Sequence, residues 1–125
     1  MSKRKPKIYI SAPITGYDLD ERRKQFAKWA QVLIDAGCEP VNPMDKDLPD
    51  EAPYREHMKE DISLLLDCDG YVISNRFTQS QGCQVEDAVA FACGIEFVGY
   101  MREESGEMEF ELKKLRKVKS KIRKE

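Results

Sequence analysis

The chain has 125 residues, of which 35% are charged, and its net charge is only −2. This length predicts one domain with one ordinary core. The charge is uneven, because residues 111–125 hold eight Lys and Arg against two Glu, a local charge of +6 that leaves −8 on the rest. An acidic body with a basic tail argues against a nucleic-acid-binding core, so we expect no nucleic-acid partner.

The cysteines argue against a metal centre. Cys38, Cys68, Cys83 and Cys93 form no CxxC pair, and the chain has a single histidine. A zinc site is poorly supported by this pattern, and we expect no cofactor. No signal peptide is evident and no apolar run is long enough to span a membrane, so we expect a cytoplasmic protein that has no membrane partner.

Strand-like and helix-like segments alternate along the chain. The expected strands are residues 7–11, 38–42, 69–75 and 95–100, and the expected helices run from Asp18 or Asp20 to Ala36, over 54–66 and over 83–93. In the first helix, an inward face is predicted by helical spacing of Phe26, Trp29, Ala30, Leu33 and Ile34. Residues 43–53 contain three prolines and four acids and form an unusually long loop.

This order predicts an α/β fold, a flavodoxin-like or Rossmann-like three-layer α/β/α domain with a parallel sheet of four to five strands. We expect that domain to cover residues 1–107. Residues 101–107 look like a loop or linker, and residues 108–125 like a basic C-terminal helix or tail. A broken apolar stripe runs along that tail and comprises Phe110, Leu112, Leu115, Val118 and Ile122. Such tails are usually solvated or partly disordered, and docking onto the acidic body or a partner subunit is the alternative.

Two carboxylates are candidates for one cleft. Open parallel sheets bind ligands beyond the carboxyl ends of their strands, where the 11–17, 43–53 and 75–82 loops and the start of the third helix, with Glu86, meet. Asp61 lies midway along the helix that follows the 43–53 loop and reaches toward the same edge. Asp69 begins the third strand, about 20 Å away at the opposite edge, and is interpreted as structural.

A pair of carboxylates without metal ligands favours glycosidic chemistry. One carboxylate attacks or stabilises an anomeric carbon, while the other protonates the leaving group or positions the sugar. The alternatives are structural, because an acid early in a helix usually serves the helix dipole and a mid-helix Asp usually lies on a solvated face. His57 is expected at the surface or at a helix start rather than as a catalytic base, and Tyr9 in the cleft or the core. Cys83 is a weak candidate for a reactive thiol, because a helix start lowers a thiol pKa but no general base is evident for it.

Four segments resemble the nucleoside 2-deoxyribosyltransferase superfamily, which includes deoxynucleoside monophosphate N-glycosidases. They are residues 8–16 (IYISAPITG), 41–43 (VNP), 58–70 (MKEDISLLLDCDG) and 80–94, in that order. The chain is most similar to a small uncharacterised, DUF4406-like branch. The resemblance implies that Glu86 is the nucleophile that forms a covalent 2-deoxyribosyl ester, and that Asp61 holds the nucleophile or assists departure of the base.

The same resemblance implies the residues that bind the substrate. They follow the first and third strands and comprise Ser11, Pro13, Ile14, Thr15, Gly16, Tyr17, Asn75, Arg76, Ser80 and Gly82. Ser80 lies six residues before Glu86, where the monophosphate hydrolases tend to have a serine and the transferases an acid. This points to a nucleoside monophosphate with water as the acceptor, since an acid would repel a phosphate.

Two positions depart from the family pattern. The first loop lacks the usual arginine of the monophosphate hydrolases, so phosphate would depend on backbone N–H groups, Thr15, Ser80 and Arg76. The usual Glu-Leu-Gly is Glu86-Asp87-Ala88 here, which adds a charge beside the nucleophile.

We therefore expect an N-glycosidase or nucleoside deoxyribosyltransferase acting on a (deoxy)nucleoside or its 5′-monophosphate. By the same resemblance, it would assemble as a homodimer or a higher homo-oligomer, in which a neighbour's Ser80 loop completes a site. Two alternatives remain open at this point: a non-catalytic nucleotide-binding module, and an interaction protein that acts through its basic tail.

Overall fold

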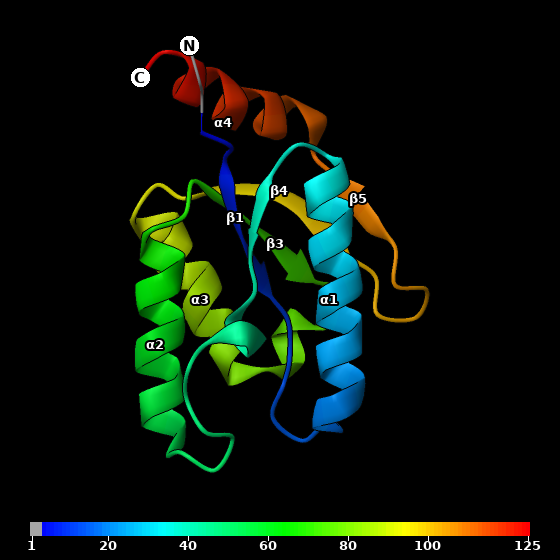
Figure 1. Cartoon of the computed structure of the whole chain (residues 1–125). Coiled ribbons are helices and arrows are strands. Elements are labelled where there is room, and N and C mark those ends of the chain that lie inside the picture. Colours follow the sequence, from blue (N-terminus) through cyan, green and yellow to red (C-terminus); the bar gives the residue numbers. More distant parts are fainter. Residues whose placement is uncertain (1–3) are drawn as a thin grey trace.

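The computed structural model describes residues 4–125, which form a five-stranded sheet between helices (Figure 1). The strands are β1 (Lys7–Ser11), β2 (Glu39–Val41), β3 (Gly70–Ser74), β4 (Glu96–Met101) and β5 (Met108–Phe110). Their order is β2-β1-β3-β4-β5, and all pairs are parallel except the antiparallel pair of β4 with β5. The predicted α/β fold class is confirmed, and the antiparallel edge strand is a correction to it.

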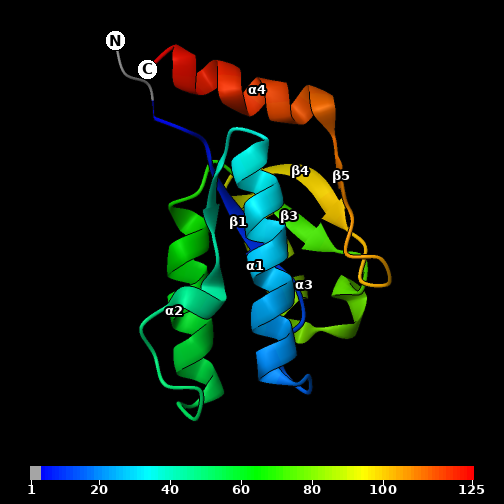
Figure 2. The same ribbon diagram turned by 45° about the vertical axis from the view of Figure 1, so that its right-hand side comes forward.

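Four helices cover the sheet: α1 (Leu19–Asp35), α2 (Tyr54–Leu66), α3 (Gln81–Ala92) and α4 (Leu112–Arg123). Alternate side chains of β1 sort them by face, because successive residues of a strand point to opposite sides. Ile8 and Ile10 pack in the cluster that contains residues of α1 and α4, whereas Tyr9 packs in the cluster that contains residues of α2 and α3. Figure 2 shows α1 crossing in front of the strands and α4 above them.

Local hydrogen bonds set the helix starts. The Asp18 carboxylate accepts from the backbone N–H of Glu21 at 3.0 Å, and the Ser80 hydroxyl accepts from that of Cys83 at 3.2 Å. Each side chain satisfies an N–H that has no partner within its helix. Because Ser80 is the cap, α3 begins at Gln81, two residues before the predicted start.

The predicted inward face of α1 is right for three of its large residues and wrong for one. Phe26, Trp29 and Leu33 are completely buried, while Ile34 is 45% exposed. Consecutive residues of a helix lie about 100° apart, so Leu33 facing the sheet turns Ile34 toward the rim of the contact.

The C-terminal segment packs on the body. Met108–Phe110 forms β5 where a helix was expected, and α4 then lies across the end of the sheet at which β1 begins (Figure 1). Leu115, Val118 and Ile122 are buried in the same cluster as α1. The Lys119 ammonium donates to the Ala36 carbonyl at 2.7 Å. The apolar stripe of α4 therefore packs into the core, and the basic side chains of the helix flank that stripe.

Asp69 lies at this same end, as the interpretation of a structural role requires. Its carboxylate accepts from the Arg4 guanidinium at 2.8 and 2.9 Å and from the Lys7 backbone N–H at 2.7 Å. Arg4 also pairs with Glu125 at 2.8 Å, which joins the two ends of the described chain. No helix within residues 4–125 is long and apolar enough to cross a membrane.

The packing of α4 makes a stability prediction. Leu115→Ala removes a leucine that is 6% exposed and lowers the free energy of unfolding by about 2–4 kcal/mol, through lost apolar burial and a residual cavity. Leu112→Ala, in the same helix but 62% exposed, changes it by about 0.5 kcal/mol or less. Urea unfolding measures both, and equal effects would contradict the docked position of α4.

Candidate active site

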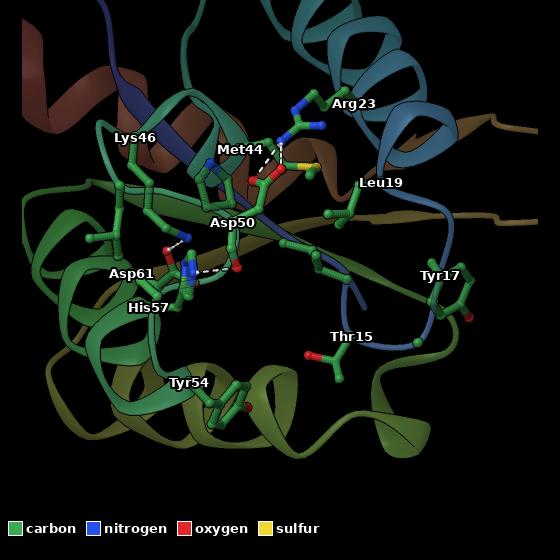
Figure 3. Close-up of a pocket in the computed structure, with 15 residues that line it drawn as sticks. Thr15, Tyr17, Leu19, Arg23, Met44, Lys46, Asp50, Tyr54, His57 and Asp61 are labelled. Atoms are coloured by element: carbon green, nitrogen blue, oxygen red, sulfur yellow. Dashed lines mark hydrogen bonds and ion pairs between the residues drawn. The ribbon is translucent and has the colours of Figure 1, made fainter.

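Three adjoining hollows lie at the edge of the sheet where the parallel strands end. A narrow slot of about 40 Å³ contains Glu86 and Asp61. A cleft of about 410 Å³ opens from it between the loop after β1 and the residue 43–53 loop (Figure 3), and a second cleft of about 400 Å³ opens beside Ser80. Thr15 and Tyr54 line all three, so the hollows form one continuous site.

Glu86 is held at the base of the slot by hydroxyl groups of β1. The Tyr9 hydroxyl donates to one carboxylate oxygen at 2.6 Å, and the Ser11 hydroxyl donates to the other at 2.7 Å. Tyr9 and Ser11 are two residues apart in a strand, so both point to the face that α3 covers. Both oxygens of Glu86 are therefore fixed in place, and the residue is buried, with only 5% of its surface exposed.

Burial shifts the ionisation of Glu86 toward neutral pH. Loss of hydration raises the pKa of this carboxyl to about 7, and the negative charge of Asp61 adds to the increase. The hydrogen bonds from Tyr9 and Ser11 and the charge of Lys46 act in the opposite direction. Carboxyl groups with a pKa raised this far are enriched at functional sites, which makes Glu86 a candidate.

Asp61 reaches the slot from α2 and is paired with a lysine. The Lys46 ammonium is 2.8 Å from one carboxylate oxygen of Asp61, and the two side chains are 10% and 9% exposed. Burial raises the pKa of Asp61, and the hydrogen bond from Lys46 opposes part of that increase. The sequence identified Asp61 but not Lys46, which lies in a loop where neither spacing nor motif distinguishes one lysine from another.

The 410 Å³ cleft combines apolar and basic walls. Figure 3 shows Lys46, His57 and Asp61 on one side and Leu19 and Tyr17 on the other. A salt bridge of 2.6 Å joins Arg23 of α1 to Asp50 of the residue 43–53 loop (Figure 3). His57 lies in the first turn of α2, as the expected surface or helix-start position requires, and its ring lines this cleft, 3.3 Å from the Asp50 carbonyl oxygen.

The 400 Å³ cleft is bordered by small polar groups. Its walls include Thr15, Ser80 and Gly82. A Cβ on Gly82 would lie 3.0 Å from the Tyr54 hydroxyl, so the tyrosine side chain of α2 packs closely against glycine at the start of α3. Gly16, with φ of +87°, turns the loop after β1 in a conformation that other residues rarely adopt.

Most of the predicted substrate-binding residues come together. Ser11 binds Glu86, and five of the others line the hollows from the loop after β1, namely Pro13, Ile14, Thr15, Gly16 and Tyr17, with Ser80 and Gly82 from the start of α3. Asn75 and Arg76 line none of these hollows. Asn75 donates to Glu104 at 3.0 Å and Arg76 lies 3.7 Å from the same carboxylate, so the loop after β4 engages both.

The sequence missed other lining residues. Besides Lys46, they come from α1, the residue 43–53 loop and α2, and include Arg23, Met44, Leu48, Asp50 and Tyr54. The signal available was the length and composition of the loop, which predicted a functional segment but not the residues that point inward.

Two neighbours of Glu86 differ from what their positions suggest. Burial raises the pKa of the Cys83 thiol to about 11, so the reactive thiol considered from the helix start is not supported. Asp87 turns away from the slot and accepts a hydrogen bond from Tyr71 at 2.5 Å, so its charge is directed elsewhere. Within residues 4–125, no three His, Cys, Asp or Glu side chains are grouped closely enough to hold a metal ion.

Glu86 predicts a pH-dependent stability difference. Its folded pKa of about 7 exceeds the ordinary 4.5, so its contribution to stability is complete below pH 4.5 and is lost as pH rises to about 7. The free energy of unfolding of Glu86→Gln, relative to that of wild type, therefore rises by up to about 3 kcal/mol between pH 5 and pH 8. Urea unfolding at both pH values measures the gain, with exposed Glu60→Gln as the control. A difference independent of pH would contradict the shifted ionisation.

The fold is similar to that of two solved enzymes. The first is a 2-deoxyribosyltransferase from Bacillus psychrosaccharolyticus, with a TM-score of 0.58 and 20% identity, covering 77% of this chain and 72% of that chain. The second is the CMP N-glycosidase BcmB of Clostridium botulinum, with a TM-score of 0.53 and 16% identity. The match covers 90% of this chain and 81% of that chain. At these identities the likeness is one of fold.

A comparison with curated proteins gives no match. The family model described as "Domain of unknown function (DUF4406)" matches residues 6–99. This range contains β1, the Lys46 loop, Asp61 and Glu86. The chain therefore belongs to the DUF4406 family, and its fold is similar to those of a deoxyribosyltransferase and an N-glycosidase.

Proposed function

We propose that the protein breaks the N-glycosidic bond of a (deoxy)nucleoside or its 5′-monophosphate. The observation that carries this proposal is the Glu86 carboxylate, fixed through both oxygens at the base of a slot that also contains Asp61. An anomeric carbon that loses its base develops positive charge, which a fixed, poorly hydrated carboxylate stabilises more strongly than water does. The deoxyribosyltransferase and CMP N-glycosidase activities named for the two similar folds support the same reaction class.

The reaction proceeds in two steps. An oxygen of ionised Glu86 forms a bond to C1′ while the C1′–N bond breaks, and its electron pair leaves with the base. The base nitrogen takes up a proton from water in the open cleft, and Asp61 orients the base through a hydrogen bond. In the second step water attacks C1′ and loses a proton to solvent, the ester bond to Glu86 breaks, and the carboxylate is restored. A second base in place of that water makes the reaction a transfer.

The two clefts suggest how a nucleotide lies. The 410 Å³ cleft, with Met44, Leu48 and Tyr54 in its walls, suits a flat base. The 400 Å³ cleft beside Ser80 suits the 5′ end, since the hydroxyl and the N–H groups at the start of α3 are donors for a phosphate. Because Asn75 and Arg76 are engaged by Glu104, we assign phosphate recognition to Thr15 and Ser80 and leave those two residues out of the proposed site.

Base release tests the activity. Deoxynucleosides, ribonucleosides and their 5′-monophosphates are incubated with and without a second free base, and released base is separated by chromatography. We expect release to rise with pH through about 7, since Glu86 attacks only when ionised. Glu86→Gln should release base about 1000-fold more slowly than wild type, or slower still. Ser80→Ala should lose activity on monophosphates but not on nucleosides.

The same experiment separates the proposal from a nucleotide-binding module. Tight binding of a nucleotide without release of base, unchanged by Glu86→Gln, would favour the module. Full release by Glu86→Gln would assign the reaction to another group. An interaction protein acting through its basic tail would lose its function on neutralisation of the α4 lysines and keep it in Glu86→Gln.

We also propose that the protein is a homodimer that uses the outer face of α3. Phe91 is 88% exposed and Val85 47% exposed, and no charged residue lies on this face, which comprises Gln81, Gln84, Val85, Ala88, Phe91 and Ala92. A charge-free stripe of this kind is typical of an interface, and α3 begins at the cleft, so a second copy here would adjoin the site.

Sedimentation measures the assembly. Wild type is expected at twice the chain mass of 14.4 kDa, and Phe91→Ser at the mass of one chain, because the apolar contact is lost. Leu112→Ser, an exposed leucine on α4 at the other end of the molecule, serves as the control and should remain dimeric. A wild-type protein of one chain mass would contradict the proposed dimer.

A further inference from the structure

Lys46 occupies an unusual position for a lysine. Its side chain is 10% exposed, and its ammonium binds the equally buried carboxylate of Asp61 at 2.8 Å. Lysines are almost never this buried unless they are paired, because removing the ammonium from water is costly. The residue 43–53 loop therefore directs a positive charge into the wall of the cleft.

Attachment of the loop does not account for this burial. The loop is already joined to α1 by the Arg23–Asp50 salt bridge, whose partners are 41% and 48% exposed. A surface pair of that kind contributes about 0–1 kcal/mol and carries no large desolvation cost. A buried pair does carry that cost and is also a weak source of stability, so the burial of Lys46 points to a role of its charge in the site itself.

The groups around Glu86 come from every element that packs on it. β1 supplies Tyr9 and Ser11, α2 supplies Asp61 and Tyr54, α3 supplies Cys83, and the loop supplies Lys46. His57 and Glu60 are further groups of α2 that act on Asp61. Among the charges, that of Asp61 raises the pKa of Glu86 and that of Lys46 lowers it.

We propose that Lys46 is a positioning residue that keeps the cleft at one net negative charge when both Glu86 and Asp61 are ionised. This rests on the proposed function, in which Glu86 must be ionised to attack C1′ while Asp61 lies nearby. Without Lys46, two negative charges would share a buried slot, and the site would take up a proton instead. One net negative charge also matches the single positive charge of an oxocarbenium-like transition state.

The proposal is tested without substrate by following the carboxyl carbon of Glu86 by ¹³C NMR as pH is varied. Lys46→Met should raise the apparent pKa of Glu86 by about one unit or more, since a neighbouring charge of opposite sign is lost. Lys46→Arg should remain close to wild type. Lys59→Met, which removes an exposed lysine from the same helix as Asp61, should leave the titration unchanged.

A double variant separates charge from structure. In Asp61→Asn the pKa of Glu86 should be lower than in wild type, because one negatively charged neighbour is removed. In the double variant, Lys46→Met with Asp61→Asn, the pKa of Glu86 should return close to its wild-type value, because the net charge of the site is again −1. This pair also carries the test if Lys46→Met alone does not fold, since neither variant leaves a buried carboxylate at position 61 without its lysine. Equal pKa values for Glu86 in Asp61→Asn and the double variant would overturn the proposal.

The acid limb of the pH–rate profile should move in parallel. If base is released, Lys46→Met should need a pH about one unit higher to reach half its maximal rate. If no base is released by wild type, the proposed function fails, while the NMR titration still decides the role of Lys46. A shifted titration with an unshifted rate profile would overturn the claim that Lys46 acts through Glu86 in catalysis.

Discussion

The arrangement of the cleft depends on one constraint: a carboxylate on α3 is buried against β1 and must be satisfied there. Tyr9 and Ser11 provide one hydrogen bond to each oxygen of Glu86, at 2.6 and 2.7 Å. These bonds fix α3 relative to the end of a central strand, and the Tyr54 side chain of α2 packs closely against Gly82 at the start of α3. The cost of burying the charge persists as a pKa of Glu86 raised to about 7, a shift that makes this carboxyl a candidate for a functional site.

The two ends of the sheet serve different purposes. At the amino ends of the strands, Arg4, Asp69 and Glu125 join the two ends of the described part of the chain, residues 4–125, and α4 contributes apolar residues to the core. At the carboxyl ends, buried polar groups and open clefts replace that packing. A second buried pair, Arg22 with Glu103 at 2.8 Å, supports this edge beneath Tyr17, whose ring lies 4.5 Å from the Arg22 guanidinium carbon. The amino ends of the strands are thus closed by packing, whereas the carboxyl ends combine buried ion pairs with open clefts.

Much of this could be predicted from the sequence, because period-two and helical patterns identify elements and parallel sheets open at a known edge. That reasoning found Glu86 and Asp61. It did not find Lys46, because a side chain's direction within an irregular loop depends on tertiary contacts. It did not anticipate that Asn75 and Arg76 lie beside Glu104 of the loop after β4 and outside the lining of the three hollows. It missed β5 because three residues, Met-Glu-Phe, are too few to distinguish a strand from a helix start.

The most direct measurement is the mass of the intact protein after rapid acid quenching during turnover of a reactive nucleotide substrate. The account predicts an adduct equal to the mass of the glycosyl group, which digestion assigns to the peptide containing residues 81–92 and which Glu86→Gln does not form. Base release with no adduct at any quench time, or an adduct on a different residue, would contradict the central claim that Glu86 is the nucleophile.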